Sequence, residues 1–364
     1  MEDAHRILCT LALIVVLGVG GQWLAWAVRL PSVLVLLALG MLSGAGFQWL
    51  DPDQTFGTVL QPAVSLAVGF ILFEGGLSLK LTELKAVWKS LLGLLTIGVV
   101  ATWLAAAWGA VSLLPISTST ALVMGALLTV TGPTVIGPLL REIRPSGNVG
   151  LVARWEGITI DPVGAILAVL VFEFTEDFRQ AELDTALTDA LTGLAATAAG
   201  GCLTGILCGW SLAAVLRRYW VPDHLRNPVA LLMTTVAFAA AESLHHEAGL
   251  IAVTLMGVWL ANQKDLDLHG ISEFKESVTV LLISGLFILL TARLPASALT
   301  TLGVRGVLFA GFIILIVRPT AVLLSTWNSG LSLNERLFLC WFAPRGIVAA
   351  AVSSVFALRM GAEG

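Results

Sequence analysis

The sequence predicts an all-α polytopic membrane protein. Of its 364 residues, 57% are hydrophobic and only 12% carry a charge. So few polar side chains cannot coat a water-soluble globule of this size. Long apolar runs alternate with short connections that hold most of the charges, a pattern typical of helices that cross a bilayer core about 30 Å thick.

Apolar windows between turn residues and charge clusters predict twelve spans. Their limits are 7–28, 31–49, 57–78, 86–111, 118–141, 148–174, 185–217, 225–242, 248–262, 276–293, 303–327 and 333–360. The first window is too long for a signal peptide and its head carries Glu2 and Asp3 beside Arg6, so we expect an uncleaved first helix. The windows 225–242 and 248–262 are short enough to be tilted or partly re-entrant.

The connections alternate in charge, which predicts the orientation of the bundle. The odd-numbered connections carry the basic residues Arg29, Lys80, Lys85, Lys89, Arg141, Arg144, Arg217, Arg218, Arg226, Lys264 and Lys275. The even-numbered connections carry the acidic residues Asp51, Asp53, Glu173, Glu176, Asp177, Glu182, Asp184, Glu242 and Glu247. Since basic connections stay in the cytoplasm, we expect a multi-pass protein of the bacterial inner membrane with its N-terminus outside.

The sequence gives no sign of an enzyme, a resident metal or a nucleic-acid partner. The net charge of −4 is small and spread over the connections. His245, His246 and Glu247 lack the HExxH spacing of a zinc hydrolase, and we expect a solvated loop there. The cysteines lack CxxC spacing and fit small core hydrophobes. They are Cys9, Cys202, Cys208 and Cys340.

Two predicted spans are interrupted by proline and glycine. The window 118–141 contains Thr131, Gly132 and Pro133, and the window 333–360 contains Pro344 and Gly346. Proline removes a backbone donor and glycine relaxes the helix, so polar backbone groups near Thr131 are freed. Each break alone fits a packing kink, but a break in each half of the chain, together with buried charges, favours the ion site of a secondary transporter.

The span 148–174 carries two carboxylates, where an ionised side chain costs several kcal/mol. Glu156 and Asp161 differ by roughly 140° around a helix, so they face different neighbours. We expect Glu156 to pair with Arg345 across the bundle. Asp161 has no obvious adjacent cation, and we expect a proton and a cation to compete for its desolvated carboxylate. The alternative, compatible with this role, is that Asp161 caps a helix that resumes at Pro162.

Two further charges lie toward cytoplasmic ends of spans. Glu74, in the segment Phe73-Glu74-Gly75-Gly76-Leu77, is either a snorkelling surface glutamate or part of a cation path. Arg318 precedes a proline in the window 303–327, and we expect it to snorkel to the interface without an assigned role.

The window 185–217 carries a stripe of small residues that lets another helix approach closely. The stripe consists of Gly193, Thr197, Gly201, Gly205, Gly209 and Ala213. Its partner is either a helix of the same chain or a second copy of the chain in a homodimer.

Four segments together resemble the NhaP-type sodium/proton exchanger branch of the monovalent cation:proton antiporters. They are 73–77, 131–134, 155–162 and 343–348, and they agree in order and spacing over nearly the whole chain. The resemblance implies an inverted-repeat bundle with two broken crossing helices. Residues 1–174 would form the first six-helix repeat, 185–217 the linking helix, and 225–364 a second repeat that lacks its last helix.

The resemblance also implies an activity and roles for residues. The chain would exchange Na⁺, and also Li⁺, for H⁺ by alternating access, with K⁺/H⁺ exchange as the alternative and a cation channel as a more distant one. Asp161 would bind the cation or the proton, Thr131 would be a ligand at the first break, and Glu74 would match an acidic residue of the third helix. Gly157 stands where relatives often place a serine, so only its backbone could contribute.

Three departures from the family pattern stand out. Ile160 replaces a common asparagine, and Gly132 stands where many relatives have an aspartate, so polar neighbours of Asp161 are missing. Twelve spans instead of thirteen lead us to expect a truncated form, with a last helix and a cytoplasmic regulatory domain beyond residue 364.

A single carboxylate suggests electroneutral exchange, one proton for one cation. The family also suggests a homodimer.

Overall fold

The computed structural model describes residues 2–132, 136, 139–140, 143–177, 183–264, 266, 269–294 and 296–342. In the first half of the chain these residues form helices throughout. They are α1 (Glu2–Val28), α2 (Ser32–Met41), η1 (Leu42–Gly46), α3 (Pro52–Phe56), η2 (Gly57–Val59), α4 (Leu60–Leu77), α5 (Leu81–Gly93), η3 (Leu94–Gly98), α6 (Val99–Leu113), α7 (Thr118–Leu127) and α9 (Val149–Asp177).

The second half continues in the same way, and the described residues contain no strand. Its helices are α10 (Leu183–Arg217), η4 (Asp223–Leu225), α11 (Arg226–Leu244), α12 (Ala248–Ala261), α13 (His269–Ala292), α14 (Ala296–Phe312), η5 (Ile313–Val317), α15 (Arg318–Ser325) and α16 (Leu333–Trp341). The prediction of an all-α protein is confirmed for the described part of the chain.

Seven helical stretches of the described residues are long and apolar enough to cross a membrane. They are His5–Val28, Pro52–Leu77, Leu81–Leu113, Val149–Thr175, Thr192–Arg217, Asp223–Leu244 and Gly303–Ser325. Four shorter apolar helices, Ser32–Gly46, Thr118–Leu127, Ala248–Ala261 and Ser277–Ala292, coincide with further predicted windows. Most of the last window, 333–360, lies outside the described residues, so the total of twelve spans stays a prediction.

Two of the long stretches and one of the shorter apolar helices contain a π-helical turn. η1 extends α2, η3 joins α5 to α6, and η5 joins α14 to α15. A π-helical turn inserts one extra residue into an α-helix and is frequent at functional sites. The extra residue rotates the side chains that follow it about the helix axis, so the residues before and after each turn face different neighbours.

Side chains fix the starts of several helices. Asp51 accepts a hydrogen bond from the backbone of Gln54 at 3.0 Å at the start of α3. Ser332 and Glu335 form a reciprocal capping box at the start of α16. Such caps satisfy backbone N–H groups that have no partner inside the helix.

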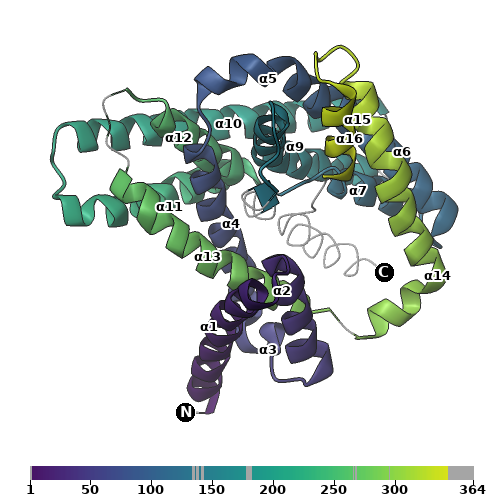
Figure 1. The fold of residues 1–364 in the computed structure, drawn as a ribbon, viewed down its shortest axis with the longest axis horizontal. Helices are drawn as coiled ribbons and strands as arrows, with labels where there is room; N and C mark the ends of the chain where they lie inside the picture. The colour runs from purple at the N-terminus through teal and green to yellow at the C-terminus, as the bar shows by residue number, and fades with distance from the viewer. Residues whose placement is uncertain are drawn as a thin grey trace.

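Two groups of helices flank α9, while α1, α2 and α3 lie together apart from both. Figure 1 shows α10, α11 and α12 together on one side of the molecule and α6, α14 and α15 on the other, with α9 between them. The helix α12 also packs along α4, and α7 packs along α9. The ends of α7 and α16, the two helices that the sequence predicts to be interrupted, both lie near α9.

The small-residue stripe of α10 packs against α12. A Cβ atom added at Gly205 would overlap the backbone of Ala252, one at Gly201 would lie 2.8 Å from the carbonyl oxygen of Ala248, and one at Gly209 would lie 3.1 Å from Trp259. Of the two partners left open by the sequence, a helix of the same chain therefore occupies the stripe. The homodimer stays a prediction that would need another surface.

The α10–α12 contact predicts a steep cost for a side chain at Gly205. Replacing Gly205 with leucine should lower the free energy of unfolding by about 1–3 kcal/mol, because the backbone of α12 leaves no room for a side chain there. Thermal denaturation in detergent measures the effect. The control is Gly20→Leu, since no atom lies within 4 Å of a Cβ at Gly20. Equal melting temperatures of the two variants would contradict the contact.

Candidate functional site

One face of α9 lies directly against the interruption after α7. Gly157, Asp161 and Gly164 are spaced by four and three residues, so they share this face. A Cβ at Gly157 would overlap the side chain of Ile136, and a Cβ at Gly164 would overlap Val130. Asp161 lies midway between the two contacts and therefore faces the segment that contains Thr131 and Gly132.

The interruption begins at the end of α7. The helix ends at Leu127, the backbone N–H of Thr129 bonds to the carbonyl of Ala126 at 3.0 Å, and residues 130–132 are not helical. Thr131 is buried, and its hydroxyl oxygen has no hydrogen-bond partner among the described residues. Pro133, the other residue predicted to break this span, lies outside the described residues.

Asp161 is completely buried. Its exposed fraction is 0%, and neither carboxylate oxygen has a hydrogen-bond partner in the described part of the chain. An ionised carboxylate in such surroundings is strongly destabilised unless a cation or a proton neutralises it. Asp161, with the unpaired hydroxyl of Thr131 on the facing segment, therefore forms a candidate site for a small cation or a proton.

The helix α9 does not restart at Pro162. It runs without a break from Val149 to Asp177 with Pro162 inside it, so the prediction that Asp161 caps a resumed helix is wrong. Proline lacks the N–H that would bond to the carbonyl four residues earlier. The carbonyl of Ile158, one turn before Pro162, consequently lacks its usual helical donor beside the candidate site.

Glu156 is held by a different partner on a different face of α9. Its two oxygens accept hydrogen bonds from Nη1 and Nη2 of Arg318 at 2.6 and 3.0 Å. Arg318 also donates to the carbonyls of Leu339 and Phe342 at 3.3 and 3.4 Å. These carbonyls lie at the end of α16, where backbone acceptors have no partner within the helix. One guanidinium thus joins α9, α15 and the end of α16.

The expectation that Arg318 snorkels to the interface is wrong. Only 6% of Arg318 is exposed, and its bidentate ion pair with Glu156 is buried. The sequence did contain a sign that Arg318 is buried, because Arg318 is the single charged residue between Arg305 and Glu335. Arg345, the predicted partner of Glu156, lies outside the described residues, as do Pro344 and Gly346.

Glu74 lies on α4 close to α9. The residue is half-buried, and a Cβ at the next position, Gly75, would lie 3.3 Å from Ile158. The contact places α4 beside the turn of α9 that precedes Asp161. No described contact joins Glu74 to Asp161, so a role for Glu74 in the cation path stays a prediction.

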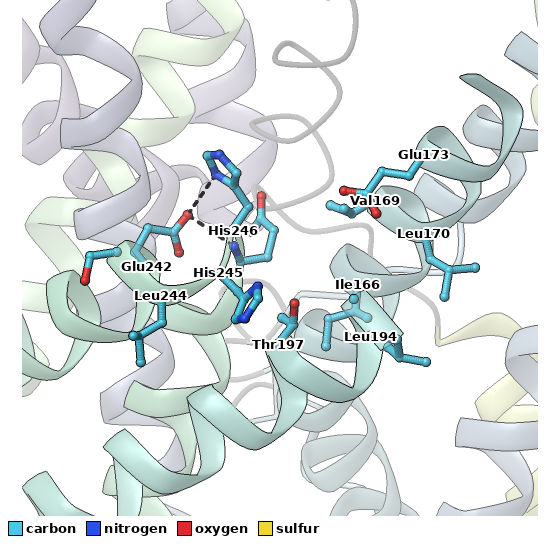
Figure 2. A pocket seen from close by; sticks show the side chains of 13 residues that line it. Ile166, Val169, Leu170, Glu173, Leu194, Thr197, Glu242, Leu244, His245 and His246 are labelled. Atoms are coloured by element: carbon cyan, nitrogen blue, oxygen red, sulfur yellow. Dashed lines mark hydrogen bonds and ion pairs between the residues drawn. The ribbon is translucent and has the colours of Figure 1, made fainter. Parts of the chain in front are cut away.

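A cavity of about 360 Å³ lies farther along α9 (Figure 2). Its walls come from α9, from α10 and from the turn between α11 and α12. Glu242 accepts hydrogen bonds from the backbone N–H groups of Glu247 and Gly249 at 3.1 and 3.3 Å. His245 and His246 line the same cavity and are both exposed, as expected for a solvated loop.

The buried ion pair predicts that Arg318→Gln strongly destabilises the protein. Leaving Glu156 charged, buried and unpaired should cost about 3–5 kcal/mol, measured by thermal denaturation in detergent. The control is Arg293→Gln at the ion pair with Asp53, which is 2.9 Å long and whose Asp53 side chain is 58% exposed. It should cost less than about 1 kcal/mol. The double variant Glu156→Leu/Arg318→Met should recover most of the loss, and no difference between the two single variants would contradict this account.

Comparisons with known proteins agree with the fold. The family "Sodium/hydrogen exchanger, transmembrane" matches residues 10–361. The Na⁺/H⁺ antiporter 1 of Methanocaldococcus jannaschii is 25% identical over 354 residues, which cover 94% of this chain and 81% of that relative. The K⁺/H⁺ antiporter NhaP2 of Shewanella baltica is 26% identical over 343 residues, which cover 92% of this chain and 57% of that relative.

A solved structure shares the fold. The sodium proton antiporter MjNhaP1 from Methanocaldococcus jannaschii, at pH 8, superposes with a TM-score of 0.86 at 23% identity and covers 100% of this chain and 91% of that one. The resemblance carried by the four sequence segments is thereby confirmed. Because the family match extends over almost the whole chain, this protein belongs to the sodium/hydrogen exchanger family.

Proposed function

We propose that this chain exchanges a monovalent cation, in the first place Na⁺, for H⁺ at Asp161. Membership of the exchanger family supports cation/proton antiport. The observation that carries the assignment of the site is Asp161 itself, fully buried and with no described hydrogen-bond partner on either oxygen. A site of this kind needs an occupant, and either a cation or a proton satisfies it.

The proposed mechanism follows from competition at one carboxylate. A proton neutralises Asp161 as completely as a cation does, and the two cannot share the same charge. The hydroxyl of Thr131 and the carbonyl of Ile158 supply further oxygen ligands of the kind that hard cations prefer. Exposing the site to one side of the membrane and then the other exchanges the two ions without an energy source beyond their gradients.

The proposed architecture has two inverted repeats, 1–174 and 225–364, with α10 as the link. The π-helical turns η3 and η5 support it, since each interrupts the apolar stretch that precedes a helix predicted to be broken. A cavity of about 10 Å³ is lined by Leu94 and Gly98 of η3 together with Glu156 and Arg318. Arg318 directly follows η5, so corresponding elements of the two halves meet at the ion pair.

We propose that the outer mouth of the ion path is the cavity lined by the second half of α9. Glu173 lies about three helical turns beyond Asp161 on the same helix and lines this cavity with Glu242 and Glu247. Carboxylates in a narrow opening raise the local concentration of cations. This side of the protein also carries the acidic connections, consistent with the proposed orientation in which the N-terminus is outside.

K⁺ is the second candidate for the cation. Ile160 and Gly132 offer no polar side chain beside Asp161. Fewer protein ligands favour a cation that is less costly to dehydrate than Na⁺. The similarity to the K⁺/H⁺ antiporter NhaP2 of Shewanella baltica agrees with this alternative, although the chain spans only 57% of that relative.

We expect Asp161→Asn to abolish exchange. Asparagine keeps the shape of the side chain but cannot release a proton or neutralise a cation, so dequenching of a pH dye in proteoliposomes on addition of Na⁺, Li⁺ or K⁺ should be lost. The melting temperature should not fall, because the substitution removes a buried carboxylate without a described partner. Asp53→Asn, at an exposed ion pair, is the control and should retain exchange. Transport by Asp161→Asn at the wild-type rate would refute the assignment.

The single carboxylate also predicts electroneutral exchange. One proton replaces one monovalent cation at Asp161, so the net charge that crosses the membrane is zero. At symmetric ion concentrations an imposed membrane potential should therefore drive no flux in proteoliposomes. The control is an imposed Na⁺ gradient in the same vesicles, and flux that follows the potential alone would contradict one-for-one exchange.

A further inference from the structure

The connection between α10 and α11 gathers arginines and exposed aromatic side chains at the end of a long apolar helix. Arg217 ends α10, Arg218, Tyr219 and Trp220 follow it, and Arg226 begins α11. Tyr219 is 79% exposed and Trp220 is 67% exposed. Most of the surface of each aromatic residue is therefore not packed against the described protein, although large aromatic rings are usually buried.

The backbone presents Tyr219 at a conformational cost. Its φ angle is 51°, in the left-handed region. The N–H of Trp220 bonds to the carbonyl of Val215 at 3.4 Å, and the N–H of Tyr219 bonds to that of Leu216 at 3.2 Å, which is the pattern of a Schellman helix end. Glycine usually occupies the left-handed position of this motif, because a bulky side chain is strained there. Because Tyr219 occupies this position despite the strain, we infer that its ring has a function.

The arginines are held in place beside these rings. The guanidinium of Arg218 lies 5.2 Å from the ring centre of Trp220, and that of Arg226 lies 5.8 Å from the ring centre of Tyr219. Arg217 donates to the side chain of Gln263 at 2.6 Å. Cation–π contacts and such bonds orient a guanidinium without using all five of its N–H donors.

The charge of the cluster is positive although it contains one carboxylate. Asp223 lies 2.8 Å from Arg226 and is 87% exposed. Three arginines against one aspartate leave two positive charges within ten residues of chain, with the connection on the side predicted to face the cytoplasm. An anion is therefore the ligand that the cluster complements.

We propose that residues 217–226 form a binding site for the phosphate headgroup of an anionic phospholipid in the cytoplasmic leaflet. Arginine forks match phosphate oxygens, and basic groups at the cytoplasmic ends of membrane helices attract anionic headgroups. Tryptophan and tyrosine favour the same interfacial depth, where the ring meets acyl chains and the polar edge meets water. The exposed rings argue for a lipid over a soluble phosphate, because only a lipid brings apolar surface to cover them.

Native mass spectrometry of the purified full chain tests the proposal by counting bound lipids during titration with phosphatidylglycerol. Arg217→Gln/Arg218→Gln should weaken the tightest binding by about thirtyfold, as expected for two phosphate-facing charges worth about 1 kcal/mol each. Tyr219→Gly/Trp220→Ala should also weaken binding, and the melting temperature without lipid should not fall, since glycine relieves the left-handed backbone. The control is Lys80→Gln/Lys85→Gln, which removes two exposed cations from another predicted cytoplasmic connection.

Three results would overturn the proposal. The first is equal weakening by the lysine control, which would indicate a diffuse effect of charge. The second is equal affinity for phosphatidylcholine, which would exclude recognition of an anion. The third is displacement of the lipid by millimolar inorganic phosphate, which would identify a soluble ligand. The titration is independent of ion exchange, so loss of transport by Asp161→Asn has no bearing on its outcome.

Discussion

The buried ion pair between Glu156 and Arg318 is the interaction on which the rest of the structure depends. Neither charge is tolerable at its depth without the other, and the bidentate geometry leaves little freedom. The pair therefore fixes the rotation of α9 about its own axis. Once Glu156 points to α15, helical phase directs Asp161 toward the opposite side, where the segment after α7 lies. The ion pair of Glu156 thus orients Asp161, the proposed site of exchange.

The two carboxylates of α9 are both buried away from water, but they differ in how their charge is neutralised. Glu156 is satisfied permanently by a guanidinium, which also binds the carbonyls at the end of α16. Asp161 has no partner among the described residues, and in the proposed mechanism a cation and a proton occupy it in turn. A resident cation at Asp161 would remove the need for that occupant, so the exchange proposed at Asp161 requires the two side chains to be separated around the helix.

Much of this arrangement could be predicted from the sequence, because it depends on local composition. Apolar windows located the helices, the residues Thr131 and Gly132 marked the end of α7, and the isolated charge of Asp161 marked the site. The partner of Glu156 was missed because hydropathy does not give depth, so Arg318 looked close enough to the interface to snorkel. The π-helical turns were missed because an inserted residue leaves no mark on composition. The capping role suggested for Asp161 failed because proline is compatible both with a helix start and with a position inside a membrane helix.

The glycine contact between α10 and α12 limits how the molecule can deform. At Gly205, α10 touches the backbone of Ala252 so closely that no side chain fits between them. If one helix slid along the other, larger side chains would enter this contact and overlap with it. The contact of Gly157 with Ile136 locks α9 to the segment after α7 in the same manner. Each pair therefore resists sliding at its glycine contact. The cavity of about 360 Å³ separates part of α9 from α10 and from the turn between α11 and α12, so these surfaces are less tightly packed than the glycine contacts.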